Sequence, residues 1–244
     1  MINLKISIIT VTFNDALVLS DCIKSVINQS HGSIEHIIVD GGSNDGTVEF
    51  IKSIQSNKLK LIEYGKKSSY PSFMNLAIKN SSHDFICQWN ADAILINSWS
   101  EIIDSITNEK YDFYIFNWKL AAKISDMNDE TWVQGDSKID GWYLEDKTED
   151  GGVLTMNYGV YKKELFTKIG LYDKKFDFWF ADGDLSNRCH YFGFKHLSLK
   201  GTKVLVLDSP KSRELQKRDK KTYDKNLKLY KKNKIPRRIE FLKS

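Results

Sequence analysis

Short apolar runs alternate with amphipathic stretches along most of this chain. The apolar runs cover residues 4–12, 34–40, 59–64 and 84–89. After the first run, apolar residues recur at helical spacing, at Leu19, Cys22, Ile23, Val26 and Ile27. Continuous apolar runs of this length are typical of strands buried on both faces, and the amphipathic stretches predict helices that pack on the sheet.

The pattern predicts further elements beyond residue 70. They are helices at 72–80, 98–108 and 182–192, and strands at 112–118 and 203–207. A polar turn at 43–46 places Asn44 or Asp45 where it caps the helix that runs through Ile54. Residues 121–151 show no clear periodicity, so we expect a loop there. The alternation of strand and helix predicts an α/β fold with a doubly wound, mostly parallel sheet.

The composition is that of a chain with a substantial core. Hydrophobic residues make up 41% of the 244 residues, and aromatic residues make up 12%. No apolar run is long enough to cross a bilayer, and no secretory signal opens the sequence. The three cysteines, Cys22, Cys87 and Cys189, stand in apolar stretches, so we expect reduced core residues and a cytoplasmic protein.

The net charge of +4 hides an asymmetry between the two parts of the chain. Residues 209–244 hold 14 Lys or Arg against 4 Asp or Glu, so the rest of the chain is slightly acidic. Leu215, Tyr223, Leu227 and Tyr230 give this tail a weakly amphipathic helical pattern. We therefore expect a basic, helical extension after a main domain at 1–208. It could contact an anionic membrane surface or support a dimer, and its alternative is a solvated helical face.

Two predicted strands end at residues suited to a ligand. The first ends at Phe13-Asn14, and the second ends at Asp40, which two glycines follow. Ligands of open α/β sheets bind at the carboxyl ends of the strands, and glycines let another group approach the backbone. The two strand ends predict a nucleotide-like pocket with an aromatic wall and a buried carboxylate, although Asp40 could instead cap the turn.

Several motifs in a fixed order give this chain a family resemblance. They are SIITVTFN at 7–14, SVINQS at 25–30, EHIIVDGGSNDGT at 35–47, MNLAI at 74–78, WNAD at 89–92 and DGDLSNR at 182–188. Together the motifs span roughly the first 205 residues. The sequence resembles a family 2 glycosyltransferase of the GT-A fold, a Rossmann-like, mixed but mostly parallel sheet flanked by helices.

The resemblance implies which residues contact a UDP-sugar donor. Asp40 matches the carboxylate that accepts a hydrogen bond from the N3 imide of uracil. Phe13 stands where many relatives have Tyr, and it keeps a ring that can stack on the base. The other implied donor contacts are Thr10, Asn14, Asn75, Asn90, Ala91 and Asp92.

The resemblance also implies a divalent cation. Asn90-Ala91-Asp92 matches the Asp-x-Asp motif with Asn in place of the first Asp, and the carboxylate that often follows is replaced by Ala93. Asp92 matches a ligand of Mn²⁺ or Mg²⁺, which prefer oxygen ligands. Asp208 stands where relatives often have a histidine ligand, so we expect it as a second metal ligand, with a turn residue as the alternative.

Asp182 matches the general base of the family pattern Glu-Asp-x-Asp-Leu-x-x-Arg. Ala181 replaces the Glu of this pattern. The alternative for Asp182 is a helix N-cap. Asp184 and Arg188 are four residues apart, so we expect them to pair and anchor the helix. Trp142, Trp179 and Phe180 are candidates for a wall that stacks on an acceptor sugar, or for core residues.

Together these inferences predict an inverting glycosyltransferase. It would move a sugar from a UDP-sugar to a hydroxyl of a glycan or another acceptor, with metal assistance and an Asp base. One alternative is a non-catalytic protein that binds a nucleotide sugar, because Asn90, Ala93 and Ala181 depart from the pattern. A less favoured alternative is a sugar nucleotidyltransferase, which would want a glycine-rich phosphate loop. No specific nucleic-acid recognition is expected, because the tail lacks a reader motif.

Overall fold

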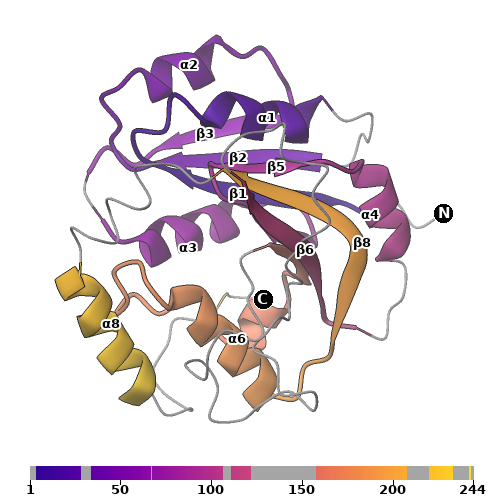
Figure 1. Ribbon diagram of the computed structural model, residues 1–244, viewed down its shortest axis with the longest axis vertical. Helices are drawn as coiled ribbons and strands as arrows, with labels where there is room; N and C mark the ends of the chain where they lie inside the picture. The colour runs from indigo at the N-terminus through magenta and orange to yellow at the C-terminus, as the bar shows by residue number, and fades with distance from the viewer. Residues whose placement is uncertain are drawn as a thin grey trace.

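A mixed sheet of eight strands forms the centre of the molecule (Figure 1). The computed structural model describes residues 4–28, 34–66, 68–106, 111–121, 158–207, 220–232 and 242. The strand order is β3-β2-β1-β4-β7-β6-β8-β5. The strands are β1 Ile6–Thr12, β2 Ile34–Asp40, β3 Leu59–Glu63, β4 Phe85–Gln88, β5 Ala93–Leu95, β6 Phe113–Ala121, β7 Gly159–Lys162 and β8 His196–Leu207.

The first half of the sheet is parallel, as its continuous apolar runs predicted. Strand β1 pairs with β2 on one side and with β4 on the other, and β2 pairs with β3. The register sets Thr12 opposite Asp40. Both strands therefore end at the same edge, and the residues that follow them lie next to each other.

The second half of the sheet differs from the sequence prediction in its details. Strand β7 runs antiparallel to both β4 and β6, and β5 runs antiparallel to β8. The short strand β5 was not predicted, and β8 begins at His196 rather than at residue 203. A Cβ atom at Gly159 would lie 2.4 Å from the carbonyl oxygen of Tyr114, so only glycine allows β7 to approach β6 this closely.

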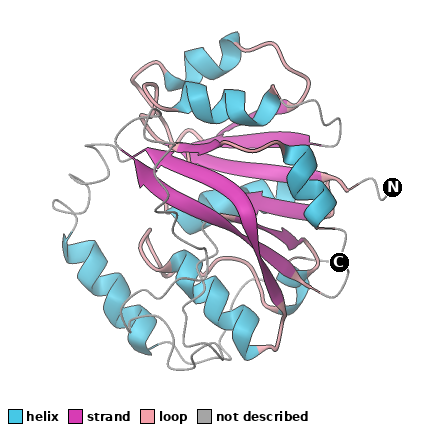
Figure 2. Ribbon diagram, turned by 45° about the vertical axis from the view of Figure 1, so that its right-hand side comes forward, coloured by secondary structure: helices cyan, strands magenta, loops and turns pink. Residues whose placement is uncertain are grey.

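Helices cover both faces of the sheet (Figure 2). They are α1 Leu19–Ile27, α2 Thr47–Ser53, α3 Tyr70–Asn80, α4 Trp99–Ser105, α5 Leu165–Lys168, α6 Ala181–Tyr191 and α8 Lys220–Lys232. Helices α1, α2 and α4 supply one apolar cluster, whereas α3, α5 and α6 supply a second. The buried residues of α1 are Leu19, Cys22, Ile23 and Val26, four of the five that its spacing predicted.

Local signals explain several helix starts. Ser98 accepts a hydrogen bond from the backbone of Glu101 at 3.3 Å and caps α4, and Pro71 stands in the first turn of α3. At the start of α2 the chain turns through Gly46, whose φ of 92° favours glycine. Asp45, rather than Asn44, accepts the hydrogen bond from the Thr47 amide.

The basic tail contains a helix, as predicted, and this helix packs on the domain. Helix α8 lies near α6 in Figures 1 and 2. Leu229 packs against the second apolar cluster, and Lys225 forms an ion pair of 2.7 Å with Asp177. Leu242 packs on the same cluster and donates a backbone hydrogen bond to Phe166. The predicted boundary at 208/209 lies outside the described residues.

Two further predictions concern the character of the chain. All three cysteines are buried and unbridged, as expected of core residues. Within the described residues, no helix has the length and apolar character needed to span a membrane. The expected loop at 121–151 falls almost wholly outside the described residues.

Candidate active site

The loops after β1 and β2 are joined into one unit at the edge of the sheet. The Asn14 amide donates to the Ser43 hydroxyl at 2.8 Å, and the Asn44 amide donates to the Asn14 side chain at 2.8 Å. The Asp15 amide donates to the Thr47 hydroxyl at 3.1 Å. Asn14 adopts a φ of 56°, an uncommon conformation for a residue other than glycine. These contacts hold the two predicted ligand loops in one fixed arrangement.

Asp40 is buried beneath this pair of loops, with only 2% of its surface exposed. One carboxylate oxygen accepts the amides of Gly42 and Ser43 at 2.7 and 2.9 Å, and the other accepts the Ser43 hydroxyl at 2.5 Å. The carboxylate therefore caps the glycine turn, which was the alternative to base recognition. A carboxylate offers about four acceptor positions, so this role leaves one for a ligand.

The other residues predicted around the nucleotide differ in position. Phe13 is 53% exposed and thus presents its ring to the surface rather than to the core. Thr10 is fully buried, and its hydroxyl lies 2.9 Å from Nε2 of His36. Phe13 is thus placed to meet a ligand with its side chain, whereas the Thr10 hydroxyl faces the interior of the sheet.

Asn75 has a clear structural role. Its side-chain amide donates to the Tyr172 carbonyl at 2.9 Å and accepts from the Tyr172 amide at 2.8 Å. The Tyr172 hydroxyl in turn donates to the side chain of Gln88 at the end of β4. Asn75 is 2% exposed, and its two hydrogen bonds fix the segment around Tyr172.

Asn90, Ala91 and Asp92 connect β4 to β5. The Asn90 side chain donates to the Tyr158 hydroxyl at 2.9 Å, and Ala91 is buried. The Leu207 amide donates to the Asp92 carbonyl at 2.9 Å. Leu207, the last residue of β8, is therefore hydrogen-bonded to Asp92. The next residue, Asp208, lies outside the described residues.

Asp182 lies in the first turn of α6. The helix begins at Ala181, so Asp182 is inside the helix and does not occupy the N-cap position of the alternative prediction. Phe180, directly before the helix, has a φ of 66°. Strained backbone of this kind is frequent at functional sites. The turn at Phe180 sets where the first turn of α6 presents its carboxylate.

Asp184 and Arg188 anchor α6, as predicted. Both side chains are buried, and they form an ion pair of 3.1 Å. Arg188 also donates to the carbonyls of Ile169, Gly170 and Leu171. Burial lowers the pKa of Arg188 to about 10. The guanidinium thus ties the start of α6 to the segment that Asn75 fixes.

Tyr158 is affected by the charges of both Asp92 and Asp182. Burial raises the pKa of the Tyr158 hydroxyl well above its ordinary value, and the charges of Asp92 and Asp182 raise it further. Asp182 also raises the pKa of Tyr70 and Tyr172, again after burial as the largest cause. Two carboxylates 90 positions apart in the sequence therefore act on one hydroxyl.

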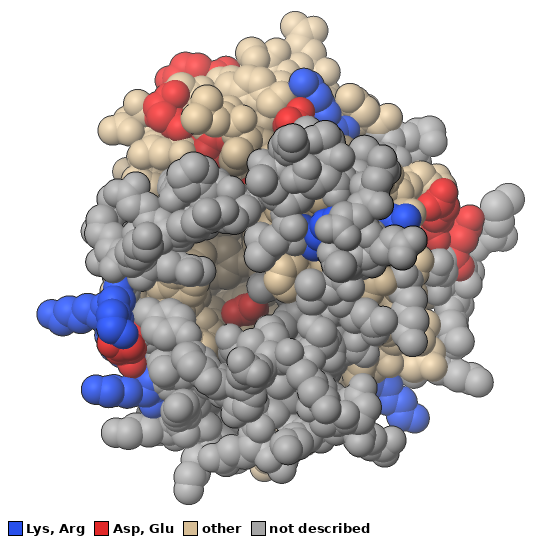
Figure 3. Space-filling view, in the orientation of Figure 1, with Lys and Arg blue, Asp and Glu red and all other residues tan. Residues whose placement is uncertain are grey.

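Sequence reasoning missed these tyrosines. Tyr158 follows a long stretch without periodicity, and its only local signal is the glycine after it, which β7 requires. Figure 3 shows a hollow on this face of the molecule, with an acidic side chain visible inside it.

The predicted aromatic wall is only partly as expected. Phe180 is 6% exposed and belongs to the core, and Trp142 lies outside the described residues. Trp179 packs at the margin of the core and contacts Phe178 edge to face. Phe178, which was not predicted, is 48% exposed and also contacts Tyr70. Phe178 therefore presents an exposed aromatic ring in the segment before α6.

The donor set at Asp92 suits a hard divalent cation. Within the described residues, no group of three His, Cys, Asp or Glu side chains is arranged to hold a metal. Mg²⁺ is commonly held by one or two carboxylates together with substrate phosphates. A single carboxylate at a partly exposed strand end fits that mode. Asp92 would provide this ligand, and Asp208 is the predicted second ligand.

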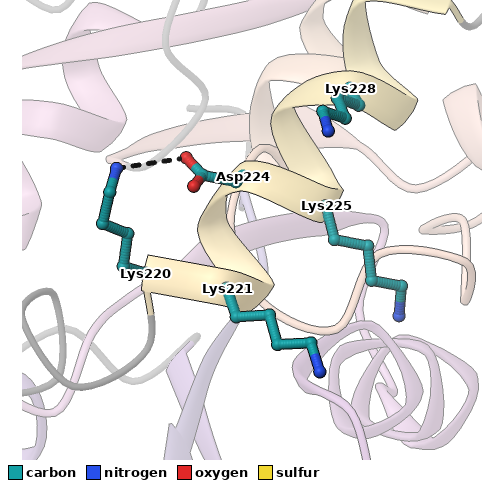
Figure 4. A pocket seen from close by; sticks show the side chains of 5 residues that line it. All are labelled: Lys220, Lys221, Asp224, Lys225 and Lys228. Carbon is teal, nitrogen blue, oxygen red and sulfur yellow. Dashed lines mark hydrogen bonds and ion pairs between the residues drawn. The ribbon is translucent and has the colours of Figure 1, made fainter.

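A separate basic surface lies on α8 (Figure 4). It borders a cavity of about 680 Å³. The lining side chains are Lys220, Lys221, Asp224, Lys225 and Lys228. Lys220 pairs with Asp224 at 3.4 Å, and the other lysines of this surface project away from the helix.

Sequence comparison places this chain among known relatives. A family model described as glycosyl transferase family 2 matches residues 7–162. The poly-β-1,6-N-acetyl-D-glucosamine synthase of Staphylococcus epidermidis is 23% identical over 195 residues, which cover 78% of this chain and 47% of that protein. Glycosyltransferase GlyG of Streptococcus pneumoniae is 23% identical over 177 residues, covering 67% of this chain and 58% of that protein. The chain thus spans about half the length of these relatives.

Solved structures share the fold. Staphylococcus aureus TarS 1–349 in complex with UDP matches with a TM-score of 0.67 and 15% identity, over 85% of this chain and 61% of that one. Mannosyltransferase PcManGT from Pyrobaculum calidifontis, in complex with GDP-Man and Mn²⁺, matches with a TM-score of 0.65 and 12% identity, over 95% and 66%. With the fold and more than half of the sequence matched, this chain belongs to glycosyl transferase family 2.

Proposed function

We propose that this chain transfers a sugar from a UDP-sugar to an acceptor hydroxyl with inversion at the anomeric carbon. The observation that carries the proposal is the family match over residues 7–162, which includes the metal-ligand candidate Asp92. The base candidate, Asp182, stands in the first turn of α6. The charges of both carboxylates raise the pKa of the buried Tyr158 hydroxyl, which supports their placement in one site.

The uridine end of the donor is assigned to the loops after β1 and β2. Asp40 is proposed to accept from the N3–H of uracil, and the exposed ring of Phe13 is proposed to stack on the base. Asn14 supports both loops through its bonds to Ser43 and Asn44. TarS has been crystallised with UDP and with UDP-GlcNAc, so UDP-GlcNAc is the first donor to test.

The transfer step itself is assigned to Asp182. Its carboxylate accepts the proton of the acceptor hydroxyl as that oxygen attacks the anomeric carbon. The bond between this carbon and the diphosphate oxygen breaks, and UDP leaves with the electron pair. An α-linked donor would give a β-linked product. A cation bound at Asp92 would supply charge neutralisation to the departing diphosphate.

Because Asn90, Ala93 and Ala181 depart from the family pattern, experiment must distinguish a transferase from the non-catalytic alternative. Ala93 and Ala181 are both fully buried, so a carboxylate would not fit at either position without repacking. Asp92 remains from the first of these motifs, and Asp182 and Asp184 remain from the second. Turnover of a UDP-sugar by the chain decides between a transferase and a protein that only binds a nucleotide sugar.

The test is UDP release from UDP-GlcNAc and other UDP-sugars by the purified chain with Mn²⁺. Slow donor hydrolysis reports the donor without knowledge of the acceptor. Asp182→Asn should lower turnover by roughly 10²- to 10⁴-fold, because it removes the base. Asp92→Ala should lower turnover by roughly 100-fold and weaken its dependence on Mn²⁺, because the leaving group loses neutralisation.

Asp104→Asn on the exposed face of α4 is the matched control, and its turnover should equal that of the wild type. Unchanged rates in both site variants would refute the assigned roles. UDP binding without any turnover, across donors and acceptors, would favour the non-catalytic alternative. Release of pyrophosphate from UTP and a sugar phosphate would favour a nucleotidyltransferase.

A further inference from the structure

Tyr158 and Asn90 form a hydrogen-bonded pair in the centre of the candidate site. The Asn90 side-chain amide donates to the Tyr158 phenol oxygen at 2.9 Å. The Tyr158 ring contacts Trp89 edge to face and also lies against Trp118, so it has a fixed position. Only 3% of the residue is exposed.

The hydrogen-bond arrangement leaves the phenol proton available. A phenol is both a donor and an acceptor, and Asn90 uses the acceptor position. Within the described part of the chain, no side chain or carbonyl accepts the proton of Tyr158. A phenol proton without an acceptor in the protein can be donated to a ligand. Asn90 stands two residues before Asp92 in the turn after β4, so the hydrogen bond places this hydroxyl next to the segment that carries the proposed metal ligand.

We propose that Tyr158 donates a hydrogen bond to the sugar end of the bound donor, and that Asn90 directs its proton there. The inference rests on the proposed function and extends it to Tyr158, which lies outside all of the family motifs named above. The sugar end is the part of a UDP-sugar that lies between a diphosphate at Asp92 and a base at Asp182. The acceptor atom on the ligand is a sugar hydroxyl or the oxygen that links the sugar to the diphosphate.

The pair also gives a physical reason for asparagine at position 90. An ionised aspartate accepts hydrogen bonds and cannot donate one. With Asp at this position, the phenol would donate to residue 90 and its proton would be withdrawn from the ligand. Asn90 instead donates, so the Tyr158 proton stays directed at the donor. The replacement of the first Asp of the motif thus fits the presence of Tyr158.

The first test is Tyr158→Phe, which keeps the ring and its aromatic contacts. Donor hydrolysis should fall by roughly 10- to 100-fold, the effect of one lost hydrogen bond to a charged or reacting group. UDP affinity measured by calorimetry should stay within twofold of the wild type, because UDP lacks the sugar. The ratio of variant to wild-type turnover should be constant between pH 6 and 9, because the hydroxyl only donates a hydrogen bond.

Tyr161→Phe is the matched control, a buried tyrosine on β7, three residues after Tyr158, whose side chain packs in the second apolar cluster. Its turnover should equal that of the wild type. Turnover of Tyr158→Phe within threefold of this control would overturn the inference. A loss of UDP affinity as large as the loss of turnover would also overturn it, since it would place the hydroxyl on the nucleotide or in the folding of the site.

The second test is Asn90→Asp, which restores the acidic motif. We expect turnover to fall, and we expect Tyr158→Phe added to this variant to change turnover by less than twofold. Turnover equal to or above that of the wild type would contradict the role of the pair. If the wild-type chain turns over no UDP-sugar, the proposed function fails first; if it does and these variants behave like the controls, only the further inference fails.

Discussion

Asp40 and Asp184 are both buried carboxylates, yet their partners suit them to different tasks. Asp184 pairs with the buried guanidinium of Arg188, so its charge is compensated inside the helix anchor. Asp40 is held by amides and one hydroxyl of its own turn, and no cation contacts it within the described residues. Asp40 thus has no cationic partner of the kind that Arg188 gives Asp184, and one of its acceptor positions remains for a ligand.

Asp40→Ala should therefore weaken both the fold and nucleotide binding. Loss of the bonds to the glycine turn should lower the free energy of unfolding by about 1–3 kcal/mol, and UDP affinity should fall at least tenfold. Urea unfolding and calorimetry measure the two effects. Ser43→Ala, which removes only the hydroxyl bond, should reduce UDP affinity much less. Wild-type UDP affinity in Asp40→Ala would remove this residue from the site.

His36 makes the stability of the protein depend on pH. The residue is fully buried, and burial lowers its pKa to about 3. The unfolded chain has an ordinary histidine pKa of about 6.5, so between these values the unfolded state binds one more proton. The stabilisation from neutral His36 is thus complete above pH 6.5 and is lost as the pH falls towards 3.

Unfolding free energies between pH 6.5 and 5 should fall by up to about 1.4 kcal/mol per pH unit through this residue. Urea unfolding of the wild type and of His36→Gln checks the prediction, because Gln can still bond to Thr10 but does not titrate. The slope should be smaller in the variant over this window. Identical slopes would mean that His36 is accessible to protons in the folded state.

At the scale of elements, α8 braces the segment that leads into α6. Lys225 bonds to the Asp177 side chain, and the Asp177 carbonyl accepts the Tyr70 amide at 3.0 Å. Asp177 therefore connects the tail helix to the start of α3, one residue before the exposed ring of Phe178. Leu229 adds an apolar contact with the same face of the domain.

The apolar contact of α8 should matter more for stability than its ion pair. Leu229→Ala should lower the free energy of unfolding by about 1–2 kcal/mol, because a partly buried side chain is lost. Lys225→Ala should cost no more than about 1 kcal/mol, since both charged groups are well exposed. Urea unfolding measures both, with Lys221→Ala as the control. A larger cost for Lys225→Ala would reverse this assignment.

On the scale of the whole molecule, positive charge is concentrated on the tail, whereas the candidate site is acidic. Residues 209–244 carry 14 basic residues against 4 acidic ones. The exposed lysines of α8 do not all pair with the domain, so this helix offers a basic surface even while it packs through Leu229. The prediction that the tail contacts an anionic lipid surface can therefore be tested directly.

The chain should therefore bind vesicles that contain phosphatidylserine and should not bind vesicles of phosphatidylcholine alone. Each lysine near the surface contributes about 1 kcal/mol, and the attraction falls with ionic strength. Replacement of Lys220, Lys221 and Lys228 by Gln should abolish co-sedimentation at 0.15 M salt, the ionic strength at which the Debye length is about 8 Å. Equal binding to neutral vesicles would exclude an electrostatic contact.

Local sequence determined the first half of the fold and part of the site. The apolar runs and the helical spacing of Leu19 to Val26 are local patterns, and they predicted β1 to β4 and the helices between them. Parallel strands end at one edge, so the positions of Phe13, Asp40 and Asp92 at a common edge followed from the pattern. The Asp184–Arg188 pair also followed, because helical spacing brings these side chains together.

Tertiary structure decided what no local pattern encodes. The antiparallel pairing of β7 between β4 and β6 puts Tyr158 beside Asn90, 68 positions earlier in the sequence. The same packing buries Phe180 and exposes Phe178, although both are aromatic and near each other in sequence. Helical spacing and the length of apolar runs depend on neighbouring residues. Contacts between distant segments depend instead on the strand order and on close approaches such as that of Gly159.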